Sequence, residues 1–181
     1  MLFRSQGAEY LRSGNGYERA RYADALRDLA GYVRDLRQWG RGVNLPPGHV
    51  RASTYWLVRD GRRIVACSNL RHSLTPHLLH EGGHIGYGTR PSERRKGYGT
   101  KLCALTLERA RQFGIRRVLI TCDSDNVGSA RIIEANGGVL ENQVVSRETG
   151  KVKNRYWIDV GEPSAGSAAA ENAGPERADC R

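Results

Sequence analysis

The sequence lacks the features of a membrane-spanning or exported protein. No apolar run approaches the length of about 18 residues that a transmembrane helix needs. The first residues, MLFRSQGAEYLRSG, contain no apolar segment of the kind found in secretory signals. The cysteines include no C-x-x-C pair, which argues against a redox motif or a structural zinc site; they are Cys67, Cys103, Cys122 and Cys180. We therefore expect a cytoplasmic protein with buried, reduced thiols and no metal.

The chain has few acidic residues for its number of basic ones. Lysine and arginine total 29 against 19 aspartates and glutamates, which gives a formal net charge of +10. Such a surface favours anionic partners such as nucleic acids, phosphorylated cofactors or acidic membranes. However, the sequence has no aromatic stacking pattern and no zinc-finger or RNA-recognition signature. We expect neither nucleic acid nor a membrane as the partner, and an arginine-rich composition explains the charge equally well.

The length and composition predict one domain followed by a tail. A chain of 181 residues can bury one sizeable core, and no internal repeat divides it. We assign residues 1–160 to a single domain. From Gly161 onward the chain is dominated by Ala, Gly, Glu, Pro and Ser, so residues 161–181 are predicted to be disordered.

Hydrophobic periodicity and turn signals predict a mixed α/β fold, with helices flanking a central sheet. An Asp60-Gly61 pair between two apolar runs predicts a hairpin. The expected helices and strands, in chain order, are a helix over 17–39, strands over 53–59 and 62–70, a loop over 71–82, a strand over 84–89, a basic turn over 91–99, a helix over 100–113, a strand over 117–122, a helix over 128–136, and an antiparallel pair over 139–145 and 151–160.

The most informative segment is the basic turn between the strand at 84–89 and the helix that follows. Its sequence is Arg94-Arg95-Lys96-Gly97-Tyr98-Gly99-Thr100. Backbone N–H groups at a helix start have no intrahelical partner, and the helix dipole places partial positive charge there. The glycines allow an anion to approach the backbone closely. The segment therefore predicts a pyrophosphate cradle, and it matches neither a Walker loop nor a dinucleotide fingerprint.

Two motifs in this order resemble the signatures of the GNAT acetyltransferases. The first is HIGYGTRPSERRKGYG over residues 84–99: a strand, a proline, then Arg94-x-x-Gly97-x-Gly99. The second is DNVGSARIIEANGG over residues 125–138, an Asn-x-x-Ser pattern opening a helix that ends in glycine. One helix and one strand separate the two motifs, as in the family. The motifs cover about residues 83–138, and compatible elements extend the resemblance to about 53–160.

The resemblance implies that acetyl-CoA is the cosubstrate and assigns residues to it. Backbone amides from Arg95 to Thr100 would hold the pyrophosphate, with added charge from Arg94, Arg95 and Lys96. The pantetheine arm would pair with Tyr87, Gly88 and Thr89, where the strand at 84–89 splays from the parallel strand at 118–122. Asn126 and Ser129 would bond the cofactor near its pantetheine and thioester.

The sequence departs from the family at the acid and base positions. Many members carry a tyrosine in the second motif to protonate the leaving thiolate, and here Ile133 occupies that position. A carboxylate on the strand before the loop often serves as base; the counted position falls on Gly83, so Glu81 and His84 are the candidates. A non-catalytic acyl-CoA-binding protein is therefore kept as an alternative. The family's first strand is also not evident ahead of the helix at 17–39.

The acceptor is the least determined feature of the sequence. The segment from 71 to 84, with Arg71 and His72, is expected to border the acceptor site. Asp123 and Asp125 could receive a cationic acceptor, although turn and capping roles would explain them equally. An aminoglycoside-type antibiotic such as kasugamycin is one expected acceptor, and a polyamine, peptide or protein amine is another. A homodimer is kept open as the assembly state.

Overall fold

The computed structural model describes residues 25, 27–162 and 179–180 of the chain. Residues 17–24 and 26 of the helix predicted over 17–39, and most of the predicted tail, therefore lie outside the described residues. None of the described helices has the length and apolar character needed to cross a bilayer.

The first described element is the helix α3, Leu29–Gly40. Its start differs from the single helix that the periodicity predicts over 17–39. Asp28 is extended, with φ −141° and ψ 91°, and its carboxylate accepts a hydrogen bond from the Gly31 N–H. An aspartate used in this way as an N-cap starts a new helix rather than continuing one. Helical periodicity cannot detect such a break, because the apolar spacing continues across it.

One sheet is built on the predicted hairpin. The strands β1 (Ala52–Arg59) and β2 (Arg63–Arg71) pair antiparallel, and β3 (Ile85–Thr89) pairs antiparallel with β2. Asp60 and Gly61 both have positive φ, of 53° and 60°, as the tight hairpin turn requires. The short strand β7 (Asp179–Cys180) lies parallel to β1, so the strand order is β3-β2-β1-β7.

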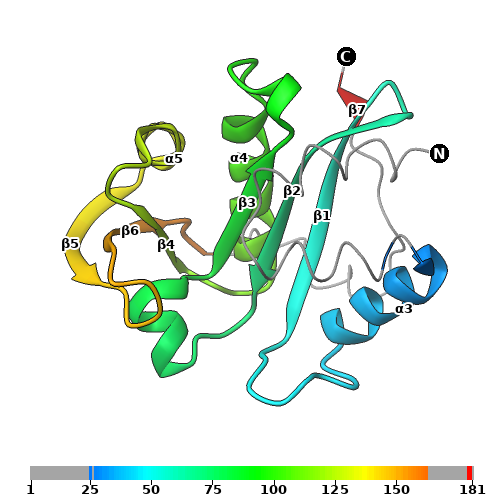
Figure 1. Cartoon of the computed structure of the whole chain (residues 1–181), viewed down its shortest axis with the longest axis horizontal. Helices are drawn as coiled ribbons and strands as arrows, with labels where there is room; N and C mark the ends of the chain where they lie inside the picture. Colours follow the sequence, from blue (N-terminus) through cyan, green and yellow to red (C-terminus); the bar gives the residue numbers. More distant parts are fainter. Residues whose placement is uncertain (1–24, 26, 163–178, 181) are drawn as a thin grey trace.

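The second sheet has the order β4-β6-β5. Its strands are β4 (Arg117–Asp123), β5 (Val139–Val145) and β6 (Val152–Asp159), and both pairings are antiparallel. Two helices connect the strands: α4 (Tyr98–Gln112) leads from β3 to β4, and α5 (Val127–Glu134) leads from β4 to β5. Figure 1 shows the two sheets side by side, with β1 on one side of the molecule and β5 on the other.

A shared core holds the two sheets together. Its largest cluster joins Leu70 and Ile85 of the first sheet to Ile120 and Ile158 of the second, with Leu107 of α4 between them. The mixed α/β architecture predicted from the sequence is confirmed. One predicted loop is more ordered than expected, because Leu78–Gly82 form a short π-helical turn, η1. Cys103 and Cys122 are buried and Cys67 is half-buried, and all three are free thiols.

Candidate functional site

The basic turn forms an open loop at the start of α4. After β3, the residues Pro91–Glu93 make a 3₁₀ turn, η2, and the chain reaches α4 through Arg95 and Gly97, both with positive φ (61° and 79°). Residues 94–97 are all exposed. A Cβ placed on Gly97 would meet nothing within 4 Å, so the loop faces open space. The first N–H groups of α4 and its dipole point into that space, which makes the loop a site for an anion.

A buried glutamate holds this loop against the β1–β2 hairpin. Glu93 is 2% exposed, and its carboxylate bonds Arg59 at 3.0 Å, Arg63 at 3.2 Å and Lys96 at 2.9 Å. The hydrogen bond from Lys96, supported by the charges of Arg59 and Arg63, holds the pKa of Glu93 below its usual value despite burial. The positive charge of Lys96 is thus largely compensated by the carboxylate of Glu93. Sequence reasoning missed Glu93; the only signal was a single acid beside a basic run.

The two sheets meet at one point and then separate. The His84 N–H donates to the Leu119 carbonyl at 2.7 Å, and the Leu119 N–H donates to the His84 ring at Nδ1 at 2.9 Å. Gly83 has φ 67°, and a Cβ there would lie 2.8 Å from the Leu119 carbonyl oxygen, so only glycine fits. Beyond this contact β3 and β4 belong to different sheets. The divergence matches the splayed parallel strands expected from the sequence.

The edge of β3 that faces this gap offers backbone hydrogen-bonding groups. The Arg71 N–H donates to the His84 carbonyl and the Arg90 N–H donates to the Val65 carbonyl, so the even-numbered residues of β3 bond β2. Successive residues of a strand point their backbone groups to opposite sides. The N–H and C=O groups of Tyr87 and Thr89 therefore face the gap, where the Thr89 carbonyl accepts a hydrogen bond from Arg94 Nε at 3.3 Å, while Gly88, opposite Cys67, faces β2. We call the space between β3 and β4 the wedge.

Side chains from β3 and from the start of α5 meet at the wedge. The Tyr87 hydroxyl lies 2.9 Å from the Ser129 hydroxyl and 3.2 Å from the Ser129 carbonyl oxygen. Asn126 caps α5 by accepting a hydrogen bond from the Ser129 N–H at 3.0 Å. The two residues assigned to the cofactor by their motif thus stand together at the start of α5. Asn126 is exposed and Ser129 is half-buried.

A comparison with protein families now decides the classification. The family model described as the acetyltransferase (GNAT) family matches residues 15–137, more than half of the chain. The chain belongs to the GNAT acetyltransferase family. A search of curated proteins finds no match.

Solved structures agree with this acetyltransferase fold. The microcin C7 self-immunity acetyltransferase MccE, in complex with acetyl-CoA and AMP, matches with a TM-score of 0.58 and 14% identity, over 87% of this chain and 83% of that one. The ribosomal-protein-S5-alanine acetyltransferase of Vibrio fischeri matches with a TM-score of 0.53 and 14% identity, over 74% and 70%. A GNAT-family acetyltransferase of Bacillus anthracis has a TM-score of 0.49 and 20% identity, over 59% and 66%, so the match spans less than two thirds of that relative.

Glu81, one of the two candidate bases of the acetyltransferase, is tied into a structural contact. Its carboxylate is 4% exposed, accepts hydrogen bonds from the Ser146 hydroxyl and, at 3.0 Å, from the Arg147 N–H, and lies 3.7 Å from His77. Burial alone would raise the pKa of Glu81, but these hydrogen bonds and the nearby histidines hold that pKa below its usual value. A carboxylate with such partners is a weak base. Its hydrogen bonds connect η1 to the turn between β5 and β6.

His84, the other candidate base, is also engaged. Nδ1 accepts the Leu119 N–H, so the remaining proton of the neutral ring sits on Nε2 and neither nitrogen is free to accept a proton. Burial, together with the charge of Arg71, lowers the pKa of His84 to about 4. His84 therefore connects the two sheets through its hydrogen bonds with Leu119, and its catalytic role stays a prediction.

The residues expected at the acceptor site have structural partners as well. Arg71 donates to the carbonyls of Gly82 and Gly83, and His72 bonds the Ser53 hydroxyl at 2.9 Å. The charge of Asp123 is compensated by Lys153 at 2.8 Å and Lys151 at 3.6 Å. Asp125 is exposed and forms no ion pair among the described residues.

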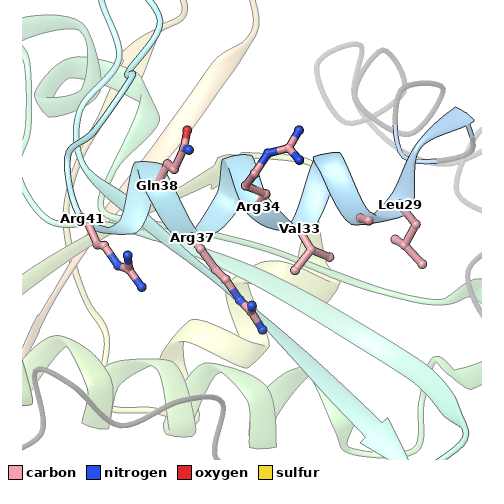
Figure 2. A pocket seen from close by; sticks show the side chains of 7 residues that line it. Leu29, Val33, Arg34, Arg37, Gln38 and Arg41 are labelled. Atoms are coloured by element: carbon pink, nitrogen blue, oxygen red, sulfur yellow. The ribbon is translucent and has the colours of Figure 1, made fainter.

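The structure contains a second hollow that sequence reasoning did not anticipate. It lies along one face of α3 (Figure 2), away from the loop at the start of α4, and is lined by Leu29, Ala30, Val33, Arg34, Arg37, Gln38 and Arg41. Its polar groups are three arginines and one glutamine, none of which is a base at neutral pH. The His77, His80 and His84 spacing forms no metal site: within the described residues, no three histidines, cysteines or carboxylates gather as ligands.

Proposed function

We propose that this acetyltransferase transfers the acetyl group of acetyl-CoA to the primary amine of a small molecule. The observation that carries the proposal is the continuity between the open loop at 94–97 and the edge of β3 that faces the wedge. The loop offers helix N–H groups and the arginines Arg94 and Arg95 to a pyrophosphate, and Arg94 Nε also bonds the Thr89 carbonyl. The adjoining edge offers the N–H and C=O of Tyr87 and the N–H of Thr89 to an extended amide chain. Acetyl-CoA has these two parts in this order.

The charges near the wedge favour an acceptor with few positive charges. Glu81 is held by hydrogen bonds and Asp123 by two lysines, so neither carboxylate is free to pair with a cation. Asp125 is the exposed exception. A polyamine would therefore find little compensation here, and the same argument ranks a singly charged amine above a heavily charged aminoglycoside. An aminoglycoside-type antibiotic such as kasugamycin, whose acetylation would confer resistance, remains the named candidate from the sequence; a peptide or protein amine is the alternative.

A panel assay tests the proposal. Purified protein, acetyl-CoA and one acceptor at a time (kasugamycin, spermidine, an amino acid, a short peptide) are followed by free-thiol release, and products are identified by the added acetyl mass. We expect release with kasugamycin or with the amino acid, the two small-molecule amines of the panel that are not polyamines. Release only with the peptide, or only with spermidine, would replace the proposed acceptor class with the matching alternative.

The second candidate function is a non-catalytic acyl-CoA-binding protein. It is favoured by the engagement of both Glu81 and His84 and by the aliphatic Ile133, which is fully buried. Calorimetry separates the two functions. Binding of acetyl-CoA without thiol release for any acceptor would support the binding protein, and absence of binding at millimolar concentration would refute both.

A further inference from the structure

The wedge needs a proton donor if acetyl transfer takes place there. This argument rests on the proposed function. When an amine nitrogen attacks a thioester carbonyl, the C–S bond breaks and its electron pair goes to sulfur, which must then be protonated or stabilised as a thiolate. Ile133, on α5, has no proton to give and is packed against Gly138 in the core. The donor, if there is one, must come from another element.

Tyr87 is the phenol that the fold brings to this place. It lies in the middle of β3, on the strand edge that faces the gap, and its side chain reaches the first turn of α5. Its ring packs against both core clusters, so its direction is fixed, yet the residue remains half-buried rather than sealed. The hydroxyl therefore spans from β3 to α5 beside the opening between β3 and β4.

The surroundings of the hydroxyl keep it protonated. Burial raises the pKa of the Tyr87 phenol, although the Ser129 hydrogen bond acts in the opposite direction. Burial likewise raises the pKa of Cys122, whose thiol also bonds Ser129. The contact to the Ser129 carbonyl, at 3.2 Å, is long for an O–H···O bond, so this hydrogen bond is weak and the O–H can turn toward another acceptor.

We propose that Tyr87 is the general acid of this acetyltransferase, donating its phenolic proton to the departing sulfur, and that Ser129 relays a proton back. The amine nitrogen forms the new C–N bond as the C–S bond breaks. The phenol proton passes to sulfur, which leaves as a thiol. The tyrosinate regains a proton through the Ser129 hydroxyl from solvent, which has received one proton from the amine nitrogen, so the proton count balances.

The test compares Tyr87→Phe with Tyr156→Phe. Tyr156 is a matched control because it is a buried tyrosine on β6 whose hydroxyl also bonds α5, through Glu134 at 3.2 Å. Tyr87→Phe keeps the ring in place and should lower kcat by about 10²-fold, with the KM for acetyl-CoA changed less than about threefold. Tyr156→Phe should leave kcat within about threefold of wild type. Equal losses in both variants would assign the effect to packing and overturn the proposal.

A second readout needs no turnover. The thiol of bound CoA is titrated by the ultraviolet absorbance of its thiolate, in wild type and in both variants. A hydroxyl that donates to the sulfur stabilises the thiolate, so Tyr87→Phe should move this titration to higher pH, and Tyr156→Phe should not move it. An active wild type with unchanged kcat or unchanged thiol titration in Tyr87→Phe overturns this inference alone. A wild type that binds no CoA overturns the proposed function and this inference together.

Discussion

Replacing Glu81 separates a catalytic carboxylate from a structural one. Glu81→Gln keeps the shape of the side chain but removes the charge that accepts hydrogen bonds from Ser146 and from the Arg147 N–H. A hydrogen bond to a charged buried group contributes roughly 1.5–3 kcal/mol, and the amide retains part of each contact. We therefore expect a loss of about 2 kcal/mol in the free energy of unfolding. For a domain of this size, that lowers Tm by about 4–8 °C.

The stabilisation by Glu81 should depend on pH, because it requires the charged carboxylate. The pKa of Glu81 lies below its ordinary value in the folded protein, so its contribution is fully present above the unfolded pKa and is lost as pH falls through the folded pKa. Thermal unfolding followed by circular dichroism should show the Tm difference between wild type and Glu81→Gln at pH 7 and its disappearance in strong acid. Glu148→Gln is the control, because Glu148 is an exposed acid whose ion pair is with the half-exposed His77, at 3.5 Å, and this substitution should leave Tm unchanged.

Turnover measured well below Tm decides the role of this carboxylate. If Glu81 only connects η1 to the turn between β5 and β6, Glu81→Gln retains kcat within about threefold at saturating acceptor. A loss of about 10²-fold or more with an unchanged Tm would refute this reasoning and make Glu81 the general base.

Three further predictions concern the cradle, His84 and the tail. Acetyl-CoA should bind with micromolar affinity. Calorimetry should show that Arg95→Glu weakens this binding and that Arg41→Glu, at the C-cap of α3, does not. A substitution at Gly99 would be a poor probe, because its Cβ would lie 2.7 Å from Ile132 and would disturb the packing of α4 against α5. The pKa of His84 is lowered from 6.5 to about 4, so the contribution of the neutral ring to stability is complete above pH 6.5 and decreases toward pH 4. His84→Ala should therefore reduce the fall of Tm in acid. A wild-type rate that rises through pH 6–7, and loses that rise in His84→Ala, would instead make His84 the base. A chain ending at Gly161 loses the two-residue pairing of β7 with β1 and the exposed contacts of Glu162, which are small, so it should keep both Tm and activity. Loss of soluble protein would contradict the predicted dispensable tail.

Local signals explain most of what was predicted correctly. The Asp60-Gly61 turn, the glycines around α4 and the caps of α5 act over a few residues, so the sequence displays them directly. One misreading of an element, the helix expected across Asp28, came from periodicity that continues through an N-cap, and the sequence also did not predict the turn η1 or the short strand β7. The order of the two motifs was sufficient to indicate the family that the family model then matched.

The roles of individual side chains depended on partners that are distant in the sequence. Glu81 meets Arg147 66 residues later, and His84 meets Leu119 35 residues later, so spacing along the strand could suggest a base but could not reveal that both groups were occupied. The side-chain partners of Glu93 and Tyr87 were hidden for the same reason, since Arg59 and Ser129 approach them only when the hairpin and α5 are packed. The sequence by itself determined the basic turn before α4 and the elements around it, because turns and caps are local. Only tertiary packing decided which acids, histidines and tyrosines remain free for chemistry.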